Sequence, residues 1–161
     1  AVAVPQQGVI AMIYVLASLI GGVAGLRAFT PVAAISWAAW LGWIDLGATP
    51  LAFLGNIVAV IILSLIAVGE LVGDQLPATP SRKVPMQFGA RIVMGAVAGA
   101  LLMPASWIIG AVLGAVGAVV GTLAGAEART RLAASFDRDL PAGLLEDGLA
   151  VIAAFLIVYL V

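Results

Sequence analysis

The sequence predicts an all-α integral membrane protein, a bundle of about six transmembrane helices, and three observations lead to this prediction. The chain has 161 residues, of which 64 % are hydrophobic and only 9 % are charged, whereas soluble domains carry roughly 25 % charged residues. The mean hydropathy is +1.23. The apolar residues also gather in stretches close to the length of about 20 residues with which a helix crosses the hydrocarbon layer. We therefore expect a single transmembrane domain over residues 1–161.

Six apolar segments are separated by turns that contain proline, glycine or charged residues. They run from Gly8 to Phe29, Pro31 to Ile44, Pro50 to Val72, Phe88 to Met103, Ser106 to Leu132 and Leu144 to Val161. Polar stretches at 73–87 and 133–143 predict the longer loops, and Pro31 and Pro104 predict helix breaks. The second segment, 31–44, is short, about 21 Å as a helix. It therefore either crosses the membrane or re-enters from one side.

The basic residues predict the orientation of the chain. They occur at alternate turns, after the first, third and fifth segments, and are Arg27, Arg82, Lys83, Arg91, Arg129, Arg131 and Arg138. Short loops rich in Lys and Arg stay in the cytoplasm. Six crossings would then leave the N-terminus and the C-terminus outside, with Trp40, Trp43 and Trp107 in an aromatic belt near the outer surface.

A stripe of glycines marks the fifth segment at spacings of three and four residues. Its members are Gly110, Gly114, Gly117, Gly121 and Gly125. Small residues let membrane helices approach closely. The stripe predicts either tight packing within the bundle or a seam for a second copy or another membrane subunit.

Charged residues that border the apolar segments are the candidates for function, because each costs about 2.5–3.5 kcal/mol to insert. Glu70 and Asp74 lie four residues apart and would share a helix face, so an arginine, a bound cation or a retained proton should relieve their repulsion. Glu146 and Asp147 open the last segment, where the helix dipole favours negative charge. We expect a cytoplasm-side cluster that either locks helix ends or forms a solute, ion or proton site. Its members are Arg27, Glu70, Asp74, Arg91, Glu146 and Asp147.

The remaining polar residues have simpler interpretations. Asn56 is a lone polar residue within the third segment and is expected to hydrogen-bond to a neighbouring helix. Glu127 and Arg131 are four residues apart and predict a solvated ion pair. Asp45 is expected in a solvated turn on the outer side.

The composition also excludes several kinds of chemistry. The chain has no Cys and no His, so disulfides, thiolate nucleophiles, imidazole bases, zinc fingers and His-ligated haem are excluded. The near-neutral net charge of −1 argues against a nucleic-acid partner. We predict no cofactor and no metal site, since the arginines argue against a carboxylate-bound cation. The pair Glu70 and Asp74 leaves enzymatic acid–base chemistry open, although we expect no enzyme.

Four sequence blocks resemble a known family. They read GLRAFTP at 25–31, GELVGDQLP at 69–77, QF at 87–88 leading to Arg91, and LLEDGLA at 144–150. In order and spacing they resemble the bacterial multi-pass membrane family called domain of unknown function 4126. The resemblance implies the bacterial inner membrane and implies no activity. It singles out the recurring positions Arg27, Pro31, Glu70, Asp74, Pro77, Arg91, Glu146 and Asp147.

Two functional hypotheses follow. The first is a small-solute or ion transporter or channel with its charged site at the cytoplasmic helix ends, where helix breaks would supply backbone ligands. The second is a structural or accessory subunit, or a scaffold of a larger membrane complex, assembled through the glycine stripe. The expected partners are membrane lipid and either further copies of the chain or another membrane subunit. The substrate, the direction and coupling of transport, and the oligomeric state cannot be inferred from the sequence.

Overall fold

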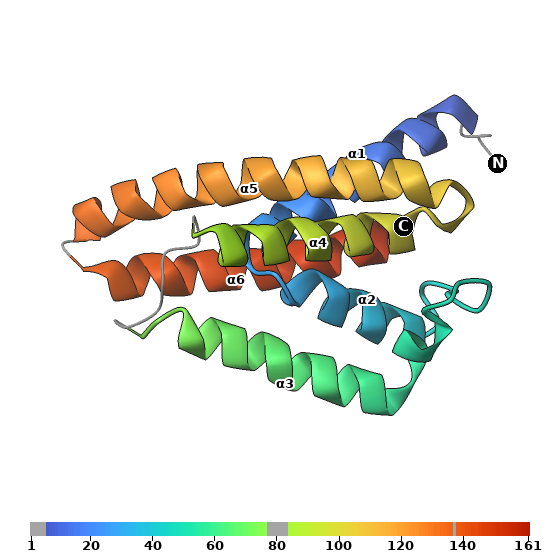
Figure 1. The fold of residues 1–161 in the computed structure, drawn as a ribbon, viewed down its shortest axis with the longest axis horizontal. Helices are drawn as coiled ribbons and strands as arrows, with labels where there is room; N and C mark the ends of the chain where they lie inside the picture. The colour runs from blue at the N-terminus through green and yellow to red at the C-terminus, as the bar shows by residue number, and fades with distance from the viewer. Residues whose placement is uncertain (1–5, 77–83, 137) are drawn as a thin grey trace.

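The computed structural model describes residues 6–76, 84–136 and 138–161, and these ranges are helical apart from short turns. The predicted all-α bundle of six helices is confirmed (Figure 1). The elements in chain order are α1 (Gln6–Leu26), α2 (Thr30–Trp40), the 3₁₀ turn η1 (Ala52–Gly55), α3 (Ile57–Gly73), α4 (Pro85–Leu102), the 3₁₀ turn η2 (Pro104–Ser106), α5 (Trp107–Phe136) and α6 (Asp139–Leu160).

Four segments of the described chain are long and apolar enough to cross a membrane, so the chain is a membrane protein. They are Gln7–Leu26, Pro85–Leu102, Pro104–Phe136 and Asp139–Leu160. Helix α3 is also apolar but has 17 residues, and α2 has 11. Successive helices run in alternating directions, and α1 begins at the same end of the bundle at which α6 ends (Figure 1).

Helix α5 organises the bundle. It packs along both α1 and α4, while α6 packs against α5, α2 and α1. Helix α3 lies at the edge of the bundle, with α2 and η1 as its main packing partners (Figure 1). The long helices α5 and α6 extend beyond the level at which α1 ends and α2 begins.

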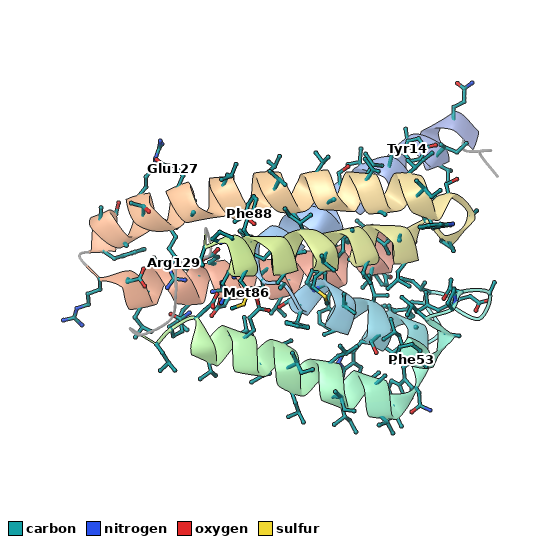
Figure 2. The ribbon with its side chains drawn as sticks, in the orientation of Figure 1. Tyr14, Phe53, Met86, Phe88, Glu127 and Arg129 are labelled. Atoms are coloured by element: carbon teal, nitrogen blue, oxygen red, sulfur yellow. The ribbon has the colours of Figure 1, made fainter. Side chains whose placement is uncertain are left out.

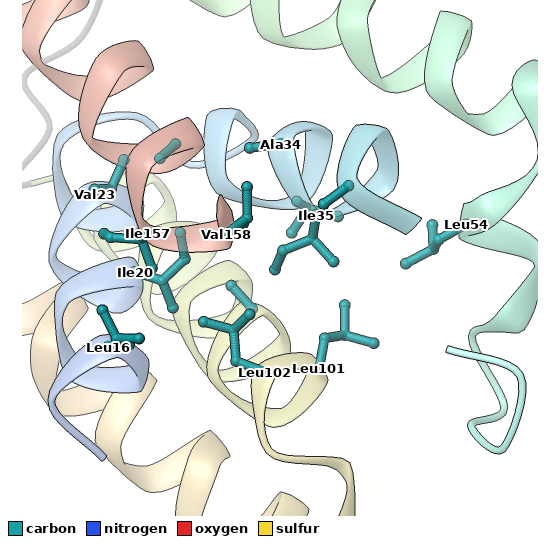
Figure 3. Packing of buried hydrophobic residues seen from close by; sticks show 14 of the residues in the cluster. Leu16, Ile20, Val23, Ala34, Ile35, Leu54, Leu101, Leu102, Ile157 and Val158 are labelled. Atoms are coloured by element: carbon teal, nitrogen blue, oxygen red, sulfur yellow. The ribbon is translucent and has the colours of Figure 1, made fainter. Parts of the chain in front are cut away.

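Helix α2 is short and is surrounded by other parts of the bundle. Eight of its 11 residues are buried, and its Ile35 packs with Ile20 of α1, Leu102 of α4 and Val158 of α6 in one apolar cluster (Figure 3). A helix that is apolar on all sides is stable when protein surrounds it. The chain after α2 continues along the bundle, and the ring of Trp43 meets that of Tyr159 edge to face at 5.5 Å. The 31–44 segment thus reaches the end of the bundle at which α6 ends.

The predicted start of the third segment at Pro50 is wrong. Residues 52–55 form the 3₁₀ turn η1, and α3 begins at Ile57. The side chain of Asn56 accepts a hydrogen bond from the backbone N–H of Val58 at 2.8 Å. Asn56 is therefore the N-cap of α3, and the expected bond to a neighbouring helix is replaced by this local one. Asparagine is among the preferred N-cap residues, and this preference could have placed the helix start correctly.

The predicted loop over 133–143 is also wrong, because α5 continues to Phe136 and α6 begins at Asp139. Pro141 is only the third residue of α6, and proline is tolerated in the first turn, where its missing N–H has no partner to lose. Glu146 and Asp147 consequently lie in the third turn of α6 and do not cap its N-terminus. A purely capping role for these two residues is excluded by this geometry.

The glycine stripe of α5 meets helices of the same chain. A Cβ atom added at Gly110 or Gly114 would overlap a backbone carbonyl oxygen of α4, and one added at Gly117 or Gly121 would overlap a backbone carbonyl oxygen of α1. Gly125 is buried as well. Glycine is required wherever two backbones approach so closely. The stripe therefore has packing partners within the chain.

Candidate functional site

The candidate site is built around the interruption between α1 and α2, where residues 27–29 leave the helical hydrogen-bond pattern. The Glu70 carboxylate accepts hydrogen bonds from the backbone N–H groups of Ala28 and Phe29, at 2.6 and 2.9 Å. The Arg91 guanidinium donates to the carbonyl oxygens of Gly25, at 2.9 Å, and of Leu26. An anion thus lies at the N-terminus of α2 and a cation at the C-terminus of α1, as the helix dipoles favour. The two charged side chains replace the backbone partners that the break removes.

Arg27 connects three helices at this break. Its side chain is 0 % exposed. Nε donates to Oδ1 of Asp147 at 2.6 Å, and one terminal nitrogen donates to Oδ2 of Asp74, also at 2.6 Å. The other terminal nitrogen forms an ion pair with Asp147 and lies 3.9 Å from Oε2 of Glu146. These charge-assisted contacts join the end of α1 to α6 and to the end of α3.

Arg91 completes the group. A terminal nitrogen of Arg91 lies 3.4 Å from Oδ2 of Asp74 and 3.8 Å from Oε1 of Glu70. Asp74 is therefore shared by Arg27 and Arg91, which relieves the repulsion that its spacing from Glu70 implies. The structure thus brings all six sequence-predicted charged residues together, and we call this group the ionic network. It comprises Arg27, Glu70, Asp74, Arg91, Glu146 and Asp147.

Three side chains that the sequence did not single out extend the ionic network. Arg129 forms a bidentate pair with Asp139, at 2.6 and 3.0 Å, and lies 3.6 Å from Glu146. Nε2 of Gln75 donates to Oδ2 of Asp147 at 2.8 Å. A helical-wheel argument could have found Arg129, because it lies two residues from each of the exposed Glu127 and Arg131 and so on a different face. Nothing in the sequence pattern marks Gln75 or Asp139.

The ionic network lies at the ends of three helices and part of the way along three others. Asp147 is 12 residues before Tyr159, near the end of α6, and Arg91 is 11 residues before Leu102 at the end of α4. At 1.5 Å per residue these separations are about 18 and 17 Å. Helix α1, by contrast, runs through 20 mostly apolar residues, Gln7–Leu26, before it reaches Arg27, a length of about 30 Å. The network is at helix ends only for α1, α2 and α3, since α4, α5 and α6 pass beyond it.

Other sequence-predicted residues lie apart from the ionic network. The ion pair of Glu127 and Arg131 is confirmed, at 2.8 Å with both side chains exposed. Figure 2 shows Glu127 on the outward side of α5 and Arg129 on the side that faces α6. Asp45 is exposed and accepts from the backbone N–H of Gly47, as expected of a turn residue. Arg82 and Lys83 lie outside the described residues.

The two predicted helix breaks differ in what they hold. Pro31 is the second residue of α2, directly after the break that binds Glu70. Pro104 opens η2, and the chain there is closed by local bonds, from Met103 N–H to Ala100 O at 3.2 Å and from Ser106 N–H to Met103 O at 3.0 Å. The charged partners are therefore gathered at the first break.

Carboxylates outnumber guanidinium groups in the ionic network by four to two, and with Arg129 and Asp139 added by five to three. The four carboxylate side chains are between 7 % and 15 % exposed. Within the described ranges, no group of three or more acidic residues is arranged to hold a metal ion.

Comparison with known proteins gives one result. A family model described as "Domain of unknown function (DUF4126)" matches residues 4–160. No curated protein and no solved structure matches the chain.

Proposed function

The chain belongs to the family of domain of unknown function 4126, and we propose that it is a membrane transporter of a small solute or ion with the ionic network as its site. The observation that carries the proposal is the burial of two arginines and four carboxylates inside a bundle of apolar helices, at the break between α1 and α2. Ionisable groups buried in a membrane bundle are rare, and they are functional-site candidates by default. Discontinuous helices are also a recurring feature of transporter sites.

The carboxylates of the ionic network support a proton as the transported or coupling ion. The four side chains are between 7 % and 15 % exposed. In surroundings of low dielectric constant each ionised carboxylate is costly unless it is paired. A proton bound among the carboxylates lowers this cost, and its release restores it, so protonation and the exposure of the site are expected to be coupled.

The test is proton flux into vesicles that contain the purified chain. A potassium gradient with valinomycin imposes an inside-negative potential, and a pH-sensitive dye inside the vesicles reports proton entry. We expect acidification with the unmodified chain. Glu70→Gln and Asp74→Asn should each slow it at least about tenfold, because each removes a carboxylate from a buried charged site.

The matched control is Glu127→Gln. It removes the same charge from an exposed side chain of α5 and should leave the flux unchanged. Equal flux in the unmodified chain, Glu70→Gln and Asp74→Asn would refute the proposed site. Loss of flux in the control as well would show that the assay responds to surface charge.

One observation favours a second candidate function, the structural or accessory subunit. Glu70 and Arg91 already occupy the backbone groups of the α1–α2 break, as expected if the network only locks helices together. The glycine stripe, by contrast, gives this candidate less support than expected from the sequence, because it packs on α1 and α4. A stable chain that moves no protons and copurifies with other membrane subunits would favour the second candidate.

A further inference from the structure

Helix α3 is attached to the bundle by little apolar packing. Of its 17 residues, all of which the structure describes, only Val60 and Ala67 are buried. A groove of about 490 Å³ lies beside η1 and the first turns of α3, lined by residues that include Phe53 and Ile62. Because membrane helices associate through close packing and polar contacts, a helix with so few buried residues needs polar contacts to stay in place.

Polar contacts supply this attachment, and the charged ones lie at one end. Midway along α3, Ser64 accepts a hydrogen bond from Nε1 of Trp37 at 3.0 Å. At the C-terminal end, Glu70 binds the two backbone N–H groups of the α1–α2 break, and Asp74 binds Arg27. Two of the four carboxylates of the ionic network are therefore carried by the helix with the least apolar attachment.

The helical backbone is interrupted where α3 begins. Gly55 ends η1, and Asn56 has an extended backbone, with φ −88° and ψ 142°, between the 3₁₀ turn and α3. A helix of 17 residues is about 25 Å long. A tilt of about 10° at this junction would therefore move the far end of α3 by about 4 Å.

We propose that α3 is an arm latched by charge: Glu70 and Asp74 hold its C-terminal end against the α1–α2 break, and neutralising them lets that end swing outward about residues 55–56. The inference rests on the proposed function in taking the ionic network as the site, and it identifies α3 as the part that opens it. The swing withdraws both carboxylates from the arginines and frees the backbone N–H groups of the break. A polar path to the break then opens on the side of α3.

Distances between spin labels test the latch without any transport measurement. The chain has no native cysteine, so no native residue has to be removed before a pair of cysteines is introduced and labelled. One pair joins Val72→Cys, at the C-terminal end of α3, to Val120→Cys on α5, and a control pair joins Val58→Cys, at the start of α3, to the same Val120→Cys. All three positions are exposed. The double substitution Glu70→Gln and Asp74→Asn is then added to each labelled pair. It should shift or broaden the distance between positions 72 and 120 by about 4 Å and leave the control distance between positions 58 and 120 unchanged.

Two results would overturn the latch: a first distance that does not change, or an equal change in both distances, which would mean that the whole bundle loosens. Glu127→Gln is the charge control and should alter neither distance. Unchanged distances together with lost proton flux would refute the latch and leave the transport site standing. Shifted distances in a chain that moves no protons would support the latch and refute the transport site.

If the doubly substituted chain does not fold, hydrogen exchange tests the latch in the chain with its native residues. The N–H groups of Ala28 and Phe29 are bonded to Glu70, so they exchange when the latch opens. We expect both to exchange at least about tenfold faster than that of Ala24, inside α1. Asp74→Asn, which leaves Glu70 in place, should accelerate both further. Protection equal to that of Ala24 would refute the latch.

Discussion

Replacing Arg27 by glutamine is expected to destabilise the bundle strongly, and the structure sets the size of the effect. The Arg27 side chain is 0 % exposed and makes 2.6 Å charge-assisted hydrogen bonds to both Asp74 and Asp147. Its removal leaves Asp74 with Arg91 at 3.4 Å and Asp147 with the neutral amide of Gln75. Removing one partner of a buried ion pair costs about 3–5 kcal/mol. Since folded proteins are stable by about 5–15 kcal/mol, roughly a fifth or more of the stability would be lost.

The same substitution at Arg131 is the matched control. Arg131 is 78 % exposed and pairs with Glu127 four residues before it, so Arg131→Gln should cost at most about 1 kcal/mol. Both variants can be unfolded by SDS in mixed micelles and followed by the fluorescence of the four tryptophans. Adding Asp147→Asn to Arg27→Gln should cost less than the sum of the single effects, because the two residues share one interaction. The reasoning would be refuted if Arg27→Gln and Arg131→Gln lowered the free energy of unfolding by amounts that agree within about 1 kcal/mol.

Two further predictions concern packing and orientation. Gly99→Ala should destabilise the bundle by about 1–3 kcal/mol, because the added Cβ would overlap the carbonyl oxygen of Gly110. Gly89→Ala on the same helix places its Cβ in open space and should stabilise the bundle by up to about 1 kcal/mol. Unfolding in SDS measures both effects, and equal effects would contradict the close approach of α4 and α5. Thiol labelling of Ala48→Cys and Ser135→Cys in sealed cells should find position 48 accessible from outside and position 135 from the cytoplasm. Labelling of both from one side would contradict the proposed orientation.

The sequence predicts the helical bundle well, because hydrocarbon imposes a simple rule on composition and length. It also identifies the six charged residues of the ionic network, since each is costly near the membrane and requires partners. The bounds of the last two helices could not be predicted in the same way. The 133–143 stretch looks like a loop because it is polar, but hydrophobicity stops being a guide where α5 and α6 leave the membrane, and both helices continue there.

The central position of α2 is the second feature that the sequence does not reveal. An apolar run such as 31–44 has the same composition whether lipid or protein surrounds it. Only the packing of Ile35 against α1, α4 and α6 decides between these surroundings. The glycines of α5 present a similar ambiguity, because close approach to another helix requires the same residues within a chain and between chains.

The charge of the ionic network has a physical cause in the α1–α2 break. A chain whose helix is interrupted at residues 27–29 within the bundle leaves backbone N–H and carbonyl groups without helical partners, and each such group that is buried and unpaired costs about 1–3 kcal/mol. Glu70 satisfies two such N–H groups and Arg91 two carbonyl groups. Inserting a charged side chain costs about 2.5–3.5 kcal/mol, which the satisfied backbone groups offset. Asp74 and Asp147 bind side chains and not backbone groups of the break, and both hold the buried guanidinium of Arg27. Removing either carboxylate takes a partner from a buried charge and is therefore expected to destabilise the bundle. A loss of flux in Asp74→Asn or Asp147→Asn consequently counts as a transport effect only where SDS unfolding shows that the variant is still folded.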